Sequence, residues 1–95
     1  MKVNLWKTII DGYHGRPNGR RLSVVREIEL PISPSVGMNI GFDGDHETIE
    51  LVSYDSDDKK INCYVESDEQ LVYGQFKGSI EELQQEYIDQ GWSKS

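Results

Sequence analysis

Cysteine, proline and histidine are scarce: the 95 residues include one cysteine, three prolines and two histidines. Cys63 therefore has no second cysteine with which to form a disulfide inside the chain. The start, MKV, is not followed by an apolar stretch long enough for a secretory signal peptide. A lone thiol without such a leader is typical of a reducing compartment, so we expect a cytoplasmic protein.

Long apolar runs are also missing. No segment approaches the roughly 18 consecutive apolar residues that a membrane-spanning helix requires, and no motif for covalent attachment of a lipid is present. We therefore expect no membrane partner.

Motifs that carry enzymatic chemistry are absent from the sequence. There is neither a nucleophile-elbow pattern nor a glycine-rich phosphate loop leading into a helix. The chain has 17 acidic residues, so the presence of two carboxylates for acid–base catalysis does not discriminate. The sequence predicts no catalytic residue and no cofactor, although an enzyme with a pocket between sheet and helix stays open as an alternative.

Acidic residues gather in two predicted turns that could offer oxygen ligands to a hard cation. The residues concerned are Asp43, Asp45, His46 and Glu47 in the first turn, and Asp55, Asp57 and Asp58 in the second. A calcium loop of the EF-hand type opening at Asp55 would need glycine at its sixth position, where Lys60 stands. His14, His46 and Cys63 lack the close paired spacing of zinc ligands. We expect solvated carboxylates and no metal site.

The charge is divided unevenly along the chain. Met1 to Leu30 carries six cations and three anions, a net charge of +3, whereas the remainder carries four cations and fourteen anions, a net charge of −10. Duplex nucleic acid is bound mostly through an extended basic surface, which this distribution does not indicate. The composition favours an acidic protein, and a nucleic-acid partner is the less favoured alternative.

Alternating apolar residues predict a series of β-strands. The expected strands are Lys2–Ile10, Leu22–Leu30, Val36–Phe42, Thr48–Asp55 and Lys60–Ser67, with Leu71–Tyr73 as either a sixth strand or a lead into a helix. The two strands around the DDKK turn at 57–60 are rich in β-branched and aromatic residues, which predicts an antiparallel hairpin. Gly37 and Gly41 indicate a bent strand.

The C-terminal segment predicts an amphipathic α-helix. Ser79 and Glu82 have the spacing of a capping box at its start. Gly91 can adopt the left-handed conformation that ends a helix, and Trp92 can then fold back on the last turn. The apolar face of the helix is formed by Ile80, Leu83, Tyr87 and Ile88.

These elements predict a single α+β domain over residues 1–95. Its expected sheet is curved and antiparallel with five to six strands, and partial closure into a barrel is an alternative arrangement. The one C-terminal α-helix is expected to pack on this sheet. A chain of this length builds a thin core, so a partner that covers further apolar surface would add stability.

The DGYHGRPNGR segment between the first two strands is expected to form a long hairpin loop. One interpretation is an anion or nucleic-acid contact, because arginines offer forked donors to phosphate and aromatic rings stack on bases. The other is a solvated loop tip whose charges keep the protein in solution. The candidate binding residues are Tyr13, His14, Arg16, Arg20 and Arg21.

Lys7 and Arg26 interrupt the apolar alternation of the first and second strands. If the alternation is unbroken, both cations point to the concave side of the sheet and could bind an anionic ligand or pair with a carboxylate. A β-bulge, for example at Val24-Val25, would instead turn them outward. We favour the outward orientation because an unpaired buried cation is costly.

Apolar side chains on the second face of the sheet predict a covered surface. Trp6, Val52 and Tyr54 are expected on this face. In so small a domain, a second apolar face indicates either a closed barrel or a surface covered by another copy. We expect self-association into a homodimer through these residues.

In size, acidity and lack of catalytic motifs the chain resembles the small accessory proteins of bacterial chromosomes, phages and mobile gene cassettes. This resemblance covers no specific residues and implies no site. The favoured function is a non-catalytic binding or protein-interaction module. The alternatives are a nucleic-acid-associated protein that uses the 13–21 loop, and a protein that binds or converts a small molecule.

Overall fold

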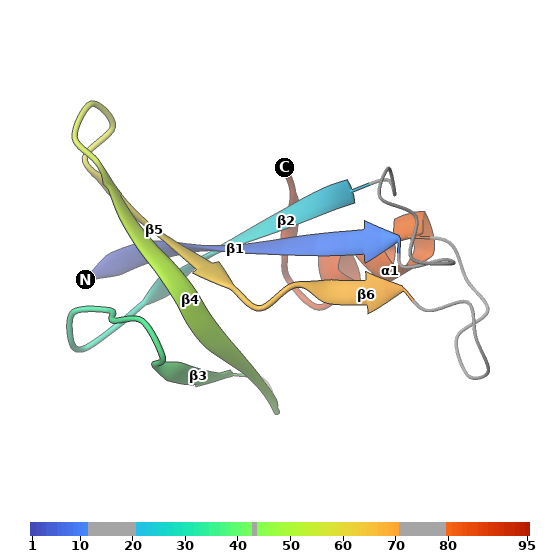
Figure 1. Ribbon diagram of the computed structural model, residues 1–95, viewed down its shortest axis with the longest axis horizontal. Coiled ribbons are helices and arrows are strands. Elements are labelled where there is room, and N and C mark those ends of the chain that lie inside the picture. Colours follow the sequence, from blue (N-terminus) through green and yellow to red (C-terminus); the bar gives the residue numbers. More distant parts are fainter. Residues whose placement is uncertain (12–20, 43, 71–79) are drawn as a thin grey trace. The chain divides into compact units, whose positions relative to one another are not determined.

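The computed structural model describes residues 1–11, 21–42, 44–70 and 80–95. It confirms an α+β protein that is mostly sheet, with one helix among the described residues (Figure 1). This helix is too short to cross a membrane. The elements in chain order are β1 (Lys2–Asp11), β2 (Arg21–Glu29), β3 (Asn39–Phe42), β4 (Asp45–Asp55), β5 (Lys60–Val65), β6 (Asp68–Gln70), α1 (Ile80–Asp89) and β7 (Ser93–Lys94).

The sheet is mixed, which corrects the prediction of a wholly antiparallel sheet. Six strands follow the order β3-β4-β5-β1-β2-β7, and β6 pairs with β1 off this path. The β3–β4, β4–β5 and β2–β7 pairs are antiparallel, whereas β1 runs parallel to both β5 and β6. Among the described strands no pairing joins β3 to β7, so the sheet is open and not a barrel.

The parallel pairing joins β1 to β5, the second strand of the β4–β5 hairpin, and to β6, which follows β5 in the chain. Val3 to Trp6 lie beside Ile61 to Tyr64, and Ile9 to Asp11 lie beside Asp68 to Gln70. The step from Trp6 to Ile9 on β1 is three positions, whereas the step between their partners, Tyr64 and Asp68, is four. The β5–β6 segment therefore contains one more residue than β1 over this stretch. Strand periodicity specifies which face a residue takes, not the direction of its partner, which is why this pairing was not predicted.

The chain forms two compact units to which β1 and β2 both contribute. The first unit comprises Met1–Trp6 and Arg26–Glu66, and the second comprises Lys7–Val25 and Ser67–Ser95. The start of β1 in the first unit lies beside the residue after β2, since the Leu30 amide donates to the Met1 carbonyl at 2.8 Å. The apolar core of this unit consists of Val3, Leu5, Leu30, Ile40, Ile49, Cys63 and Val65.

The second unit contains α1, whose end was predicted correctly. Gly91 has φ +107°, the left-handed conformation. Its amide donates to Ile88 at 3.1 Å, and the Trp92 amide donates to the Tyr87 carbonyl at 3.0 Å, the two bonds of a Schellman cap. Trp92 is buried and packs edge-on against Tyr87. The predicted N-cap, Ser79, lies outside the described residues.

Contacts to β2 and β7 hold this helix. The Gln84 side-chain amide donates to the Ser23 carbonyl at 3.1 Å, and Ile80 and Leu83 are buried. β7 follows the cap directly and pairs with β2, Val24 opposite Lys94. Neither β7 nor β6 was predicted, because two or three polar residues carry no periodic signal. The expected strand at Leu71–Tyr73 lies outside the described residues.

A β-bulge in β4 decides which side chains reach the surface. Ile49 is opposite Val65 and Leu51 is opposite Tyr64, so Glu50 is an extra residue on β4. An extra residue reverses the alternation of the residues that follow it. Ile49 is therefore buried, whereas Leu51 is 55% exposed.

Candidate functional site

The face of β4, β5 and β1 that points away from the core of the first unit is called the outer face here. Its side chains form three rows across the strands, set by the pairing registers. From β4 to β1 the rows read Leu51–Tyr64–Trp6, Ser53–Asn62–Asn4 and Asp55–Lys60–Lys2; Lys2 is placed by extending the register one residue beyond Val3–Ile61.

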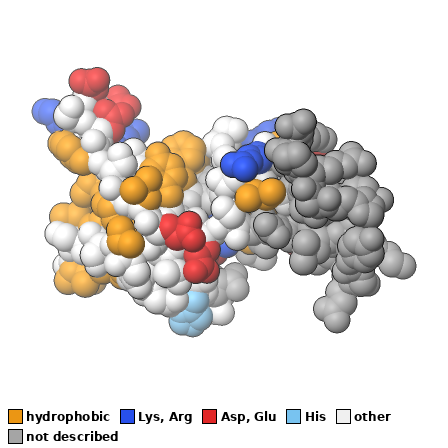
Figure 2. Space-filling model, viewed as in Figure 1, with side chains coloured by type: hydrophobic (Ala, Val, Ile, Leu, Met, Phe, Trp, Pro, Cys, Tyr) orange, Lys and Arg blue, Asp and Glu red, His pale blue; other side chains and the backbone are white. Residues whose placement is uncertain are grey.

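The first of these, the apolar row, exposes large side chains to solvent. Leu51 is 55% exposed and Tyr64 is 39% exposed. The rings of Trp6 and Tyr64 stack with centroids 6.4 Å apart. The Trp6 indole N–H donates to the Asn62 side-chain oxygen at 2.9 Å, which fixes the ring beside Tyr64. Figure 2 shows hydrophobic side chains reaching the surface over β4 and β5.

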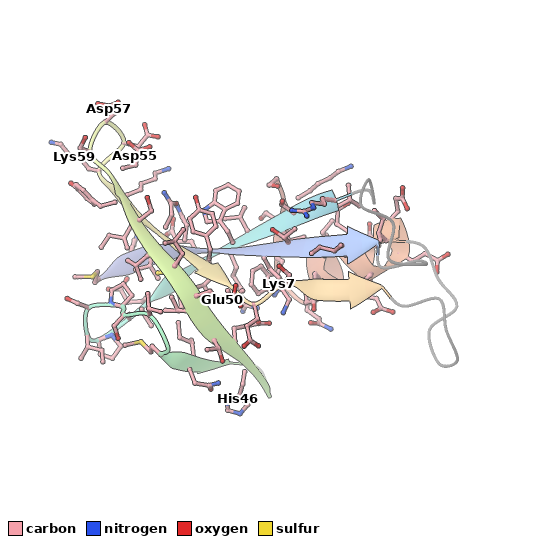
Figure 3. All side chains as sticks on the ribbon, viewed as in Figure 1. Lys7, His46, Glu50, Asp55, Asp57 and Lys59 are labelled. Carbon is pink, nitrogen blue, oxygen red and sulfur yellow. The ribbon has the colours of Figure 1, made fainter. Side chains whose placement is uncertain are left out.

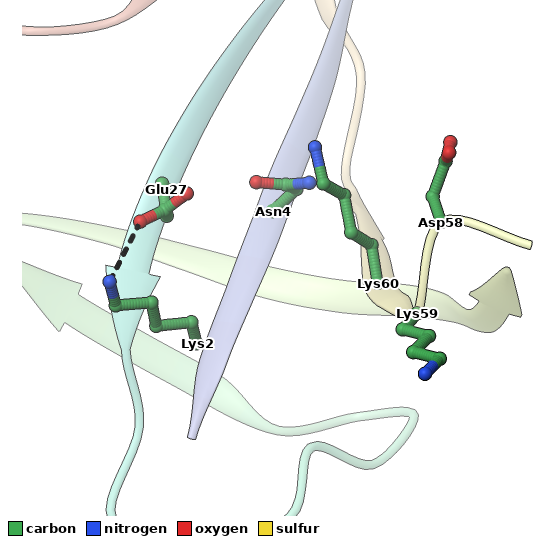
Figure 4. A pocket seen from close by; sticks show the side chains of 6 residues that line it. All are labelled: Lys2, Asn4, Glu27, Asp58, Lys59 and Lys60. Atoms are coloured by element: carbon green, nitrogen blue, oxygen red, sulfur yellow. Dashed lines mark ion pairs between the residues drawn. The ribbon is translucent and has the colours of Figure 1, made fainter. Parts of the chain in front are cut away.

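The polar end of the outer face is hollowed into a trough of about 220 Å³. Asn4 lies half-buried on β1, between the lysines of β1 and β5 (Figure 4). Lys2 Nζ lies 3.8 Å from a Glu27 carboxylate oxygen, and both side chains are mostly exposed. The trough thus offers both cations and anions, and its lining consists of Lys2, Asn4, Glu27, Asp58, Lys59 and Lys60.

The turn between β4 and β5 borders this trough and is built by Asp55. Its Oδ1 accepts hydrogen bonds from the backbone N–H groups of Asp57 and Asp58, at 3.0 and 3.2 Å. Lys59 takes a positive φ of 54° to close the turn. Asp55, Asp57 and Lys59 therefore gather at one end of the hairpin (Figure 3).

The structure separates the three predicted interface residues. Trp6 lies on the outer face, next to Tyr64. Val52 and Tyr54 lie opposite Cys63 and Ile61, on the other face of the hairpin, and Tyr54 is 63% exposed. The outer face instead carries Leu51, which an unbroken alternation would place on the same face as the buried Ile49. The change of apolar parity between residues 49 and 52 is a signal that a bulge lies in this strand, although it does not fix the bulged residue.

Lys7 and Arg26, the two cations expected to point outward, are not both on the surface. Lys7 is only 8% exposed, and its Nζ lies 5.2 Å from the centre of the Tyr87 ring. The favoured outward orientation was therefore wrong for Lys7, since the ring face offers a favourable environment to an ammonium. Arg26 is half-buried. Of the loop candidates, Arg21 is exposed at the start of β2, and Tyr13, His14, Arg16 and Arg20 lie outside the described residues.

No group of three or more metal-ligating side chains lies close enough together to hold an ion in the part of the chain that the structure describes. His46 bonds through Nδ1 to the Asn39 side chain at 3.0 Å. Glu47, on the same strand, is buried. Residue 43 of the first acidic turn lies outside the described ranges.

The comparisons with other proteins add no assignment. No protein-family model matches the chain, and no curated protein or solved structure matches it. The outer face is therefore the surface from which a function is proposed below.

Proposed function

We propose that this chain is a non-catalytic protein-interaction module that self-associates as a homodimer through its outer face. The apolar row carries this proposal. Three neighbouring strands present Leu51, Tyr64 and Trp6 side by side toward solvent. Contiguous exposed apolar and aromatic side chains with a polar surround are typical of a protein interface.

The polar residues around the apolar row favour a protein partner over a small substrate. The trough next to the row is open and its lining contains no serine, cysteine or histidine. Its side chains are mostly long and charged, as at the rim of an interface. Tyr64 and Trp6 are of the residue types that most often dominate binding energy.

Substitution Leu51→Asp tests the proposal, because it places a charge in the apolar row without touching the core. Loss of a central interface contact costs about 2 kcal/mol or more, so the dimer should dissociate roughly 30-fold more readily. Sedimentation velocity over a dilution series measures this change.

Tyr54→Asp is the matched control. Tyr54 is 63% exposed and lies on the opposite face of the same strand, so introducing the same charge there should leave the dimer intact. Equal dissociation of the Leu51→Asp and wild-type chains would contradict the proposed surface. A thermal unfolding curve for each variant verifies that the fold is kept.

A further inference from the structure

The three rows of the outer face change in chemistry from one side to the other. On β4 the members are Leu51, Ser53 and Asp55; on β1 they are Trp6, Asn4 and Lys2. Each row therefore ends in two groups that suit each other: two apolar side chains, a hydroxyl and an amide, or a carboxylate and an ammonium. Within one chain these ends are separated by β5, about 9.6 Å across two strand spacings, so they do not meet.

A two-fold axis would bring the two ends of each row together. In a symmetric dimer, residue i of one copy contacts residue j of the other and the reverse also holds. An axis lying between two stacked sheets and along β5 places β4 of one copy over β1 of the other. Leu51 then faces Trp6, Ser53 faces Asn4 and Asp55 faces Lys2, twice in each dimer.

From this self-complementary pattern we infer that the occupant of the outer face is a second copy of the chain, related by a two-fold axis roughly parallel to β5. The inference rests on the proposed function and adds the partner's orientation. Stacked sheets cross at about 30°, so each β5 strand lies about 15° from the axis. The long Lys2 side chain accommodates the resulting offset at the edge of the face.

The trough has the position that this arrangement requires. Its lining comes from the ends of β1, β2 and β5 and the turn before β5, so it lies over β1, where the end of β4 from the second copy would enter (Figure 4). Asp55 would bring a carboxylate toward Lys2. Lys60 lies near the axis and would face its own counterpart; its cross-strand neighbour is Asp55, and Asp58 lines the same trough.

Cysteine cross-linking tests the axis. Chains carrying Ser53→Cys are mixed with chains carrying Asn4→Cys, left to exchange, and treated with a short thiol-to-thiol reagent. Neither side chain makes a hydrogen bond or ion pair in the described structure, and Cys63 is fully buried. Links between positions 53 and 4 should exceed links between two copies of position 53, or between two copies of position 4, about tenfold, since only the unlike positions are opposed. Random pairing gives an excess of about twofold.

Chains carrying Tyr54→Cys, an exposed position on the opposite face of β4, serve as the control and should link poorly to either partner. A dimer whose links join 53 to 53 or 4 to 4, or whose links show only the random excess, would overturn the two-fold axis along β5 while leaving the proposed dimer standing. Chains that sediment as monomers and give no links would overturn the proposed function itself.

Discussion

At the scale of single residues, Cys63 shows how burial sets chemistry in this protein. It lies on the core side of β5, opposite Val52, and has no exposed surface. Burial raises the pKa of the Cys63 thiol, because a thiolate loses its hydration in an apolar environment. The protonated thiol is a weak nucleophile, so Cys63 acts as packing.

We therefore predict that Cys63 in the native protein reacts with a thiol reagent at least about a hundredfold more slowly than in urea, because reaction requires local opening. The time course of a chromogenic disulfide reagent at neutral pH measures both rates. Free glutathione under the same conditions provides the reference rate. Fast labelling of the native chain would show that the β5 core side is open to solvent.

Lys7 shows the limit of residue-level reasoning from sequence. The apolar alternation of β1 predicts that the Lys7 side chain faces the core, whereas the cost of burying a cation favours a side chain that faces solvent. The Tyr87 ring, 80 residues further along the chain, resolves the conflict by lying against the ammonium. Sequence alone could not identify this aromatic partner, because it comes from a distant helix.

At the scale of elements, β4 and α1 differ in how much of their structure could be predicted from their own sequences. The cap of α1 is local, because Gly91 and Trp92 follow the helix directly, and it was predicted with its glycine and its tryptophan. The bulge at Glu50 is also local, yet it was missed. Apolar residues 49 and 51 fit one face of a strand, and apolar residues 52 and 54 fit the other. Only the pairing with β5 shows where the register shifts.

The helix cap gives a prediction for stability. Alanine at position 91 would have to adopt φ near +107°, which is strained for any residue with a Cβ atom. Gly91→Ala should lower the free energy of unfolding by about 1–2 kcal/mol, measured by urea denaturation with far-UV circular dichroism. Glu86→Ala, on the exposed side of the same helix, should change it by less than about 0.5 kcal/mol. An unchanged midpoint for Gly91→Ala would contradict the capped end.

At the scale of the whole molecule, the sequence predicted the class and most strands but not the sheet. Periodicity identified β1, β2, β4 and β5 and the hairpin between β4 and β5. The direction of β1 relative to β5 depends on pairing between residues as distant as Val3 and Ile61, which no local pattern encodes. The outer face followed the same rule: strand parity alone could place Trp6 and Tyr64 on it, whereas Leu51 emerged only from the register of β4 against β5.

The mass of the chain in solution is the direct test of self-association. Light scattering on the peak from a size-exclusion column measures this mass over a dilution series through micromolar concentrations. The mass should be twice the 10.9 kDa of one chain at the highest concentration and should fall toward 10.9 kDa on dilution. A mass of 10.9 kDa at every concentration would contradict self-association through the outer face.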